Sequence, residues 1–362
     1  MKTGDDNLKE VDAIIGVIAD DLTGANDIGI MFAKHHYLTH IYPYQERGDY
    51  LKHRQGSPRV VILDTESRLD RPAEAYHKVY QATLELKETG VTRFFNKTCS
   101  VFRGNIGAEF DAMLDALGAE FALVVLGFPK NGRVTVDGIH YVHGWKLADS
   151  EFRHDPIHPM TESNLVKILE AQTTRKVASL DYRVIKRGVA ILRKKVKEMA
   201  KDCNYLILDV TNQEDLATIA FALKEYPIFC GSSALAEELP PVWGKLAGVV
   251  ETSSVPSQPN RGILAAAGSL MPQTAAQIAY WQAQGKVTIE LESVKLMVRS
   301  ERENTIARIT DMLTAKLLAG EDVLFYASTQ TAKVEATKEL GRRQGLTDRQ
   351  VGAVVSATVA EI

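Results

Sequence analysis

The sequence predicts an α/β protein made of two α/β domains with mainly parallel sheets. Short runs rich in valine, isoleucine and leucine recur along the chain, and each is followed by a longer segment with helical spacing of its apolar residues. Continuous apolar strands joined by helical crossovers are typical of parallel sheets buried on both faces. The 362 residues exceed the usual single-domain length, and a hydrophobic content of 45% is enough for a large core.

The first predicted domain, residues 1–250, carries most of this alternation. Strands are expected at 13–19, 59–65, 93–98, 121–128, 205–210 and 227–231, and helices at 25–35, 72–88, 105–117, 213–224 and 232–239. Residues 130–160 interrupt the pattern with glycine, proline, histidine and aromatic residues. The alternating run RVTVDGIHYV inside that region predicts a hairpin beside the sheet.

A polar segment rich in serine and proline, residues 251–260, is typical of an interdomain linker. The alternation resumes in a second domain, residues 261–362. Strands are expected there at 262–268, 286–291 and 322–327, and helices at 272–284, 301–319 and 330–343. The chain stops at SATVAEI, in a helical pattern, so we expect this domain to be truncated and to lack a closing strand.

Composition argues against several classes of partner. The formal net charge is −3, from 43 basic and 46 acidic residues, which gives no bulk attraction for nucleic acid or anionic lipid. No apolar run approaches the roughly 18 residues that span a bilayer, and the start MKTGDDNLKE has no apolar signal core. Three cysteines without a CxxC pattern suggest neither a disulfide framework nor a zinc site. We therefore expect a cytoplasmic protein.

The first strand ends in two adjacent acids, Asp20 and Asp21, followed by Thr23. Ligands of doubly wound sheets bind beyond the carboxyl ends of the strands. Thr23 or Asn26 is expected to cap the following helix. The alternative is that the two acids only cap the helix and interact with its dipole, although two acids exceed what capping requires.

The next two predicted strands end in further polar residues: Arg68 after one, and Lys97, Ser100, Arg103, Gly104 and the expected helix cap Asn105 after the other. Arginine offers a planar fork for a carboxylate, and glycine lets the backbone approach a ligand. The alternative for Arg68 is a solvated surface charge or a weak ion pair. The three strand ends together predict a site for a small hydroxylated anion, in which one carboxylate removes a hydroxyl proton.

Two other strand ends carry weaker signals. Lys130, Asn131 and Arg133 follow the strand at 121–128, but PKNGR also suits a plain turn. Gly268 and Ser269, in the second domain, would present a backbone N–H and a hydroxyl to a phosphate, or they simply begin the next helix.

Common catalytic motifs are missing from the chain: GxxxxGK[ST], GxGxxG, HExxH and GxSxG. His36 and His40 are spaced by four residues, as are His154 and His158, but neither pair has an evident third ligand. A surface helix end and a fixed loop are the simpler interpretations. We predict no metal-binding residues.

Seven motifs occur in the order in which they are found in the four-carbon acid sugar kinases, which the chain resembles over roughly residues 13–345. They are ADDLTGANDIG, LDTESR, KTCSVFRGNIGAE, GFPKNGRVTVDGIHYV, HDPIHPMTES, CGSSALAEEL and AAGSLMPQTAAQI. TGANDIG and FRGNIGAE look more like the D-threonate kinase branch than the 3-oxo-tetronate kinase branch.

This resemblance implies an N-terminal domain that binds the sugar acid and a C-terminal domain that binds ATP, with Mg²⁺ bridging the phosphates. The substrate would contact Asp21, Thr23, Arg68, Lys97, Ser100, Arg103 and Gly104, with Asp20 or Asp21 as the base. Gly268 and Ser269 would contact the nucleotide.

Two departures from the family pattern stand out. Lys-x-Asp-Ser-Thr is often found where this chain has Lys97-Thr98-Cys99-Ser100-Val101, so an acid and a hydroxyl are lost. Family members also have a Gly-Gly-[Asp/Glu]-Thr turn and a Lys-Ser-Gly-Gly-Phe-Gly-like loop that contact ATP, and this chain has neither. The nucleotide site is therefore expected to be incomplete.

The leading hypothesis is an ATP-dependent kinase acting on the 4-hydroxyl of a four-carbon sugar acid, with D-threonate preferred over D-erythronate and 3-oxo-tetronate. One alternative is a sugar-acid-binding protein or truncated kinase that has lost catalysis. Another is an isomerase or hydrolase that uses the same carboxylates without ATP. Whether a homodimer completes the site is left open.

Overall fold

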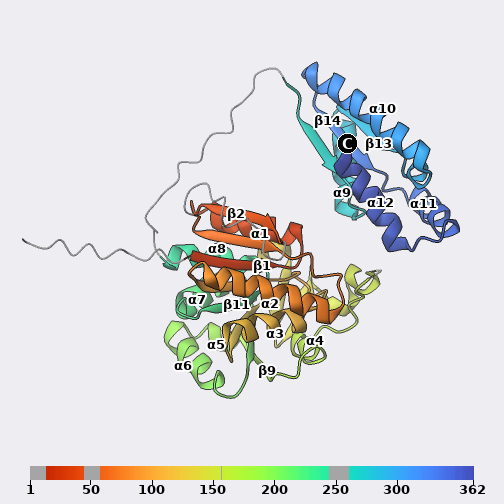
Figure 1. Ribbon diagram of the computed structural model, residues 1–362. Helices are drawn as coiled ribbons and strands as arrows, with labels where there is room; N and C mark the ends of the chain where they lie inside the picture. The colour runs from red at the N-terminus through yellow and green to blue at the C-terminus, as the bar shows by residue number, and fades with distance from the viewer. Residues whose placement is uncertain (1–13, 45–57, 156, 244–260) are drawn as a thin grey trace, which may run out of the picture. The chain divides into compact units, whose positions relative to one another are not determined.

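The computed structural model confirms an α/β protein with mainly parallel sheets, and it describes residues 14–44, 58–155, 157–243 and 261–362. The chain divides into two compact units, Met1–Ser253 and Ser254–Ile362. Both units contain strands and helices (Figure 1). No helix in the described ranges has the length and apolar character needed to cross a membrane.

The first unit is built on a parallel sheet with the order β2-β3-β1-β4-β11-β5-β10-β9. Its strands are β1 (Ile14–Ala19), β2 (Thr39–Pro43), β3 (Val60–Asp64), β4 (Val91–Lys97), β5 (Ala122–Val125), β9 (Val177–Leu180), β10 (Tyr205–Leu208) and β11 (Ile228–Gly231). The sequence analysis missed both edge strands, β2 and β9. Both are short and only partly buried, so neither shows the continuous apolar run of a central strand.

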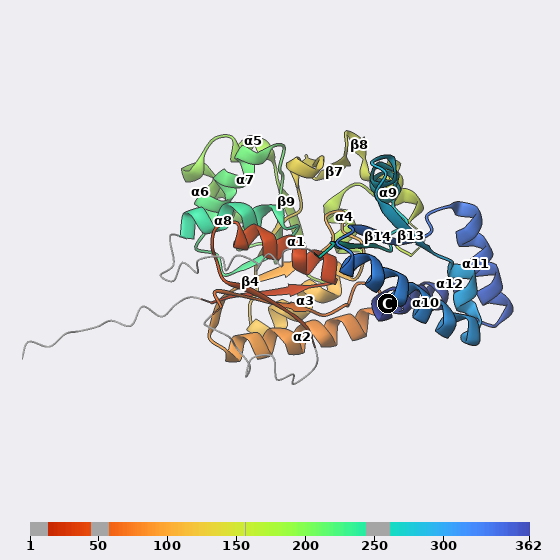
Figure 2. The ribbon, with the colours of Figure 1, turned by 90° about the horizontal axis from the view of Figure 1, so that it is seen from above.

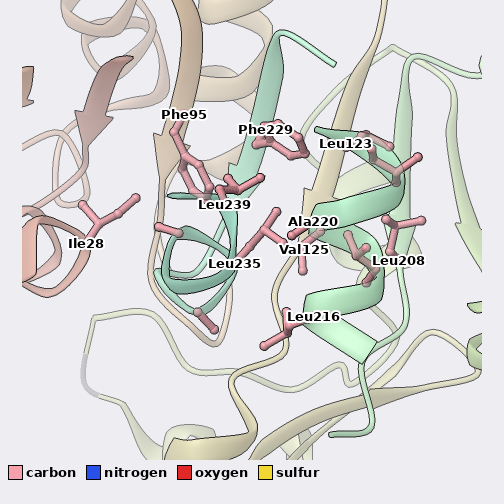
Figure 3. Close-up of a cluster of buried hydrophobic side chains, with 14 of the residues drawn as sticks. Ile28, Phe95, Leu123, Val125, Leu208, Leu216, Ala220, Phe229, Leu235 and Leu239 are labelled. Atoms are coloured by element: carbon pink, nitrogen blue, oxygen red, sulfur yellow. The ribbon is translucent and has the colours of Figure 1, made fainter. Parts of the chain in front are cut away.

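Helices cover both faces of this sheet (Figure 2). The helices of the first unit are α1 (Leu22–Ala33), α2 (Pro72–Glu88), α3 (Ile106–Leu117), α4 (Leu165–Glu170), α5 (Tyr182–Ile185), α6 (Val189–Met199), α7 (Gln213–Leu223) and α8 (Ala234–Trp243). Ile28 of α1, Leu216 of α7 and Leu235 of α8 pack in one core cluster with Phe95 and Phe229 of the sheet (Figure 3). A second cluster on the opposite face joins α2, α3 and α4 to the sheet. Burial on both faces explains the continuous apolar strands.

The interruption at 130–160 is antiparallel, as the alternating pattern predicts. Strands β6 (Arg133–Val136), β7 (Ile139–Val142) and β8 (Trp145–Lys146) form a small three-stranded sheet. A short 3-10 turn, Pro129–Asn131, leads into β6. A backbone bridge between Thr135 and Val210 ties this sheet to the loop after β10.

The second unit contains a three-stranded parallel sheet with the order β12-β14-β13. Its elements are β12 (Leu264–Ala267), β13 (Val287–Leu291), β14 (Val323–Ala327), α9 (Pro272–Ala283), α10 (Arg299–Leu318), α11 (Thr331–Arg343) and α12 (Asp348–Glu361). Phe325, Leu291 and Ile309 lie at the centre of its core. Every strand and helix predicted here is present, and the last helix, α12, begins at a capping box of Thr347 and Gln350.

Helix α1 begins three residues before the predicted position because its cap is Asp21, not Thr23 or Asn26. The Asp21 carboxylate accepts a hydrogen bond from the backbone N–H of Gly24 at 2.7 Å. Asn26 lies inside the helix and donates to the carbonyl oxygen of Leu22 at 3.0 Å. An aspartate directly after a buried strand is a strong N-cap, and the helix starts there.

Candidate active site

The predicted site residues of the first unit come from three neighbouring strands. In the sheet, β1 lies between β3 and β4, so the loops after all three emerge at the same carboxyl edge. Backbone hydrogen bonds tie these loops together: Asp20 N–H donates to the Lys97 carbonyl at 3.2 Å, and Arg68 N–H donates to the Asp20 carbonyl at 3.2 Å. The structure therefore brings Asp20, Asp21, Arg68 and Lys97 together.

Arg68 binds both acids of the first loop. Its Nε donates to Asp20 Oδ2 and its Nη2 to Asp20 Oδ1, each at 2.8 Å, and its Nη1 donates to Asp21 Oδ2. Burial works against the charge on Arg68, but Asp20 and Asp21 hold its pKa above the usual range. The fork that was expected to face a ligand carboxylate is directed at two protein carboxylates. Arg68 compensates the adjacent acids, and this explains how they can lie side by side.

The two acids differ in exposure. The side chain of Asp20 is 1% exposed and both of its oxygens bind Arg68, whereas that of Asp21 is 29% exposed. Thr23 lies exposed in the first turn of α1. Asp21 and Thr23 are therefore the members of this loop that can reach a ligand.

Gly24 packs between two charged groups. A Cβ at this position would lie 2.6 Å from Asp21 Oδ1 and 2.8 Å from Lys97 Nζ, both far inside contact distance. Lys97 is buried, and its Nζ lies 3.9 Å from Asp27 Oδ2. Asp27 also accepts a hydrogen bond from Ser233, which follows β11. Asp27 and Ser233 were not predicted as site residues, although they lie in the motifs ADDLTGANDIG and CGSSALAEEL. Their contact depends on the order of the strands, which brings α1 next to the loop after β11.

Arg103 is held on the other side of the cluster. Its Nη1 donates to Asp155 Oδ2 at 2.6 Å and its Nε to Cys99 Sγ at 3.3 Å. Burial alone would raise the pKa of Asp155, but hydrogen bonds from His158, Ile157 and Arg103 lower it. His158, which was placed in a fixed loop, therefore borders the site through its backbone N–H, and burial lowers the pKa of its ring.

Gly104 and Asn105 pack against the Arg68 loop. Gly104 has a φ of +101°, and a Cβ there would lie 2.8 Å from Arg68 Cγ. Asn105 occupies the N-cap position of α3, but its side chain makes no capping bond. Its Nδ2 instead donates to the carbonyl oxygens of Ser67 and Asp70, each at 2.9 Å. Asn105 therefore lies at the expected cap position, but its side chain fixes the loop that carries Arg68 and does not cap the helix.

Ser100 is positioned by a buried histidine, His140 of β7. Because a carbonyl oxygen only accepts, His140 Nε2 donates to the Ser100 carbonyl at 3.0 Å, and Nδ1 then accepts from the Thr135 hydroxyl at 3.0 Å. Burial lowers the pKa of His140 to about 3, so the ring is neutral at pH 7. The small sheet is thereby attached to the loop of Lys97 and Ser100.

Buried polar side chains contact the end of β1, directly before the loop of Asp20 and Asp21. Glu109 of α3 accepts a hydrogen bond from the Ser67 hydroxyl at 2.8 Å, Ser67 contacts the Thr65 hydroxyl at 2.8 Å, and Thr65 donates to the Ala19 carbonyl at 3.0 Å. Burial, reinforced by the charge of Asp20, raises the pKa of Glu109 well above its ordinary value. Glu109 is 1% exposed, and no pattern in the sequence indicates that a glutamate early in this helix is buried.

A third carboxylate lies close to the pair of acids. Asp64, the last residue of β3, is 3% exposed, and burial raises its pKa to about 6, with smaller contributions from the charges of Glu66, Asp21 and Asp20. The hydrogen bond from the Glu66 N–H to Asp64 Oδ1, at 3.1 Å, works in the opposite direction. Asp64 therefore adds to the acidic character of this strand end.

In the second unit, Gly268 and Ser269 lie between β12 and α9, as expected, and both are exposed. The Ser269 hydroxyl accepts a hydrogen bond from the Met271 N–H at 3.2 Å. No side-chain cap is present at Met271 itself. The backbone at this turn is thus open to a ligand on the side of Gly268.

Three acids outside the site, Asp137, Asp181 and Asp209, have carboxylate oxygens within 4.8 Å of one another, the only such group in the described ranges. Arg183 pairs with Asp137 and Asp181, and Asp209 accepts backbone N–H groups of Asp137, Gly138 and Tyr182. Their charges are satisfied within the protein. His40, placed on a helix end by the sequence, lies in strand β2 and contacts Tyr42.

A surface hollow of about 610 Å³ lies away from these residues, at the opposite edge of the sheet. Its lining includes Lys176 and Asn204, which directly precede β9 and β10, and Glu120, which lies two residues before β5. Because ligands of doubly wound sheets bind at the carboxyl ends of strands, this hollow is not the candidate site.

Comparisons with known proteins cover both units. A family model described as a sugar-binding N-terminal domain matches residues 15–239, and one described as a nucleotide-binding C-terminal domain matches residues 264–362. The chain is 31% identical to a 3-oxo-tetronate kinase of Pseudomonas savastanoi pv. phaseolicola, over 98% of this chain and 81% of the relative. It is 28% identical to a 3-oxo-tetronate kinase of Escherichia coli K12, over 91% of this chain and 84% of the relative.

A solved structure of a Salmonella typhimurium LT2 protein is also similar, with a TM-score of 0.76 and 26% identity. The match covers 95% of this chain and 80% of that one. The matched region therefore spans about four fifths of the length of each of these three proteins.

Proposed function

Because the chain belongs to the four-carbon acid sugar kinase family, we propose that it transfers the γ-phosphoryl group of ATP to the 4-hydroxyl of a four-carbon sugar acid. The observation that carries this proposal is the convergence of Asp21, Arg68 and Lys97 at one edge of the sheet. Acids and cations at a strand end suit a small hydroxylated anion.

We assign sugar-acid binding to residues 1–250 and nucleotide binding to residues 261–362. The predicted linker, residues 251–260, lies outside the residues that the structure describes. The two family models match within these ranges. The sugar acid would contact the predicted group Asp21, Thr23, Arg68, Lys97, Ser100, Arg103 and Gly104. Gly268 and Ser269 would contact the phosphates of ATP, through a backbone N–H and a hydroxyl.

Asp21 is the carboxylate best placed to accept the hydroxyl proton. It is more exposed than Asp20, whose two oxygens are both held by Arg68. In the proposed reaction the 4-oxygen of the acid bonds to the γ-phosphorus, the bond to the bridging oxygen of ADP breaks, and the proton passes to Asp21. Asp20 keeps Arg68, and through it Asp21, in position.

A Mg²⁺ ion carried by the nucleotide phosphates is compatible with these residues. Asp21 and Asp27 offer partly exposed carboxylate oxygens, at 29% and 37% side-chain exposure, and Mg²⁺ prefers oxygen ligands of this kind. When bound, the ion would neutralise negative charge on the transferred phosphoryl group. An ATP-dependent reaction agrees with the cytoplasmic location expected from the sequence.

Two substrates are supported by different observations. The motifs TGANDIG and FRGNIGAE favour D-threonate, with D-erythronate as its close analogue. The names of the relatives above favour 3-oxo-tetronate. Both acids place a carboxylate at one end of a four-carbon chain and a primary hydroxyl at the other, so one site geometry suits either.

ADP release from the full chain with Mg-ATP and each of the three acids tests the proposal. We expect one acid to give turnover, with a phosphorus–proton NMR coupling at carbon 4 of the product. Acid binding without turnover, measured by calorimetry, would favour the alternative of a binding protein that has lost catalysis. Conversion of the acid without nucleotide would favour an isomerase or hydrolase.

A further inference from the structure

Arg133 differs from the other cations around the candidate site because it has no carboxylate partner. Arg68 binds Asp20 and Asp21, Arg103 binds Asp155, and Lys97 lies near Asp27. Among the residues that the structure describes, none forms an ion pair with Arg133. The sequence placed this residue in a plain turn or at a polar strand end, and the family comparison gave it no role.

The Arg133 guanidinium lies on the same side of the molecule as the candidate site. It faces the ring of Phe152 at 5.9 Å, and Arg103 faces the same ring at 5.1 Å. The charged and titratable groups that act on it are Cys99, Glu151, Arg103 and Asp27. Two of these, Arg103 and Asp27, belong to the cluster already described.

The backbone of Arg133 is fixed at the start of β6. Its N–H donates to the Phe128 carbonyl at 3.1 Å, and its carbonyl accepts from the Phe128 N–H at 2.8 Å. Gly132, with a φ of +69°, makes the preceding turn, and a Cβ there would collide with the ring of His143 at 2.3 Å. The side chain therefore starts from a rigid position.

One edge of the guanidinium has no hydrogen-bond partner among the described residues. Nη1 donates to the Asn131 carbonyl at 2.5 Å, whereas Nε is buried without a hydrogen-bond partner and Nη2 has none among the described residues. A buried donor without a partner is unfavourable. Nε and Nη2 lie side by side, so together they can donate one hydrogen bond to each oxygen of a carboxylate.

We propose that Arg133 binds the carboxylate of the sugar acid through Nε and Nη2, and that it thereby makes the site select acids over neutral polyols. This inference rests on the proposed function. Burial lowers the pKa of Arg133, and Arg103 adds to that effect, whereas the acids Glu151 and Asp27 oppose it. A bound carboxylate would give the unpaired Nε donor an acceptor, and its charge would offset the repulsion between Arg133 and Arg103.

The test compares binding of D-threonate, D-erythronate, 3-oxo-tetronate and threitol, a neutral four-carbon polyol, by calorimetry. Wild-type protein should prefer one acid over threitol. Arg133→Met should lower the affinity for that acid by about 10- to 100-fold, to the affinity for threitol, because two charge-assisted hydrogen bonds are lost. Arg133→Lys keeps the charge but not the planar fork, so its affinity for the acid should lie between those of the wild type and Arg133→Met.

Arg153→Met is the matched control, since Arg153 is exposed, lies beside Phe152 in the chain, and its side chain donates to the Ala148 carbonyl. It should leave acid binding unchanged. The melting temperature of Arg133→Met without ligand should equal or exceed that of the wild type, whereas a purely structural role would lower it.

Acid affinity that stays within threefold in Arg133→Met, or an equal loss for acid and threitol, overturns this inference while leaving the proposed function intact. If the wild type binds none of the three acids, the proposed function fails and the inference fails with it.

Discussion

Asp20 and Arg68 form a two-point ion pair, with Nε to Oδ2 and Nη2 to Oδ1 both at 2.8 Å. Asp20 is 2% exposed as a residue, so its charge depends on this partner. The strands that carry them, β1 and β3, are neighbours in the sheet, but the residues are 48 positions apart in the chain. The pair links the two loops that would bind the substrate.

Replacing Arg68 with Met should destabilise the protein strongly. Removing one member of a buried pair leaves an uncompensated charge, which costs about 3–5 kcal/mol in the free energy of unfolding. The double variant Arg68→Met with Asp20→Asn should recover much of that loss. Urea denaturation measures both. Lys78→Met is the control: it breaks a more exposed pair with Asp70 and should cost about 1 kcal/mol or less. Equal losses for the two single variants would contradict the prediction.

Asp21→Asn should reduce kcat by about 10²- to 10⁴-fold, the range expected when a general base is removed. Folding should be intact because asparagine caps helices as well as aspartate does, and the bond from the Gly24 N–H is kept. Asp181→Asn is a matched control, since Asp181 caps α5 in the same way. Unchanged turnover in Asp21→Asn, measured by ADP release, would remove this acid from the mechanism.

Glu109→Gln should raise stability at alkaline pH. A carboxyl group with a raised pKa in the folded protein binds more protons folded than unfolded, so its stabilising effect is lost as pH rises above about 4.3. Glutamine removes this dependence and still accepts from Ser67. The unfolding midpoint of Glu109→Gln should therefore be close to that of the wild type at pH 4.5 and higher than that of the wild type at pH 8.

Glu109→Ala provides the comparison for that variant. It leaves a cavity and removes the acceptor of the Ser67 hydroxyl, so it should be less stable than the wild type at both pH values. If Glu109→Gln were also destabilised at pH 8, Glu109 would be ionised in the folded protein.

Acidification should destabilise the protein through His140. Its pKa is about 3 when folded, against about 6.5 when unfolded, so the unfolded state binds more protons between these values. Stability should fall as pH drops from about 6.5 towards 3, by up to about 1.4 kcal/mol per pH unit. His140→Gln should flatten this slope, and His154→Gln, an exposed control, should not. Identical slopes in urea melts of His140→Gln and wild type would refute the assignment.

Most of the fold could be predicted because the central strands are buried on both faces. β1 and β3 are nearly continuous apolar runs, β4 carries the buried pair Phe94 and Phe95, and the helices between these strands have clear apolar spacing. The edge strands β2 and β9 could not be found by the same rule, because strands that are partly exposed mix polar and apolar residues.

The candidate site was only partly predictable. Polar residues at strand ends identified Asp20, Asp21, Arg68 and Lys97, because parallel strands share one carboxyl edge. Which residues pair within the cluster depends on the order of the strands and on packing between helices. The contacts of Arg68 with the two acids, and the burial of Glu109, therefore could not be predicted from spacing along the chain.

The crowding around Gly24 has a consequence for the charges of the candidate site. No side chain fits between Asp21 and Lys97 while both charged groups keep their places. Both close atoms end flexible side chains, so alanine at residue 24 would fit only if Asp21 Oδ1 or Lys97 Nζ moved. One added methyl group would therefore change where these two charges lie.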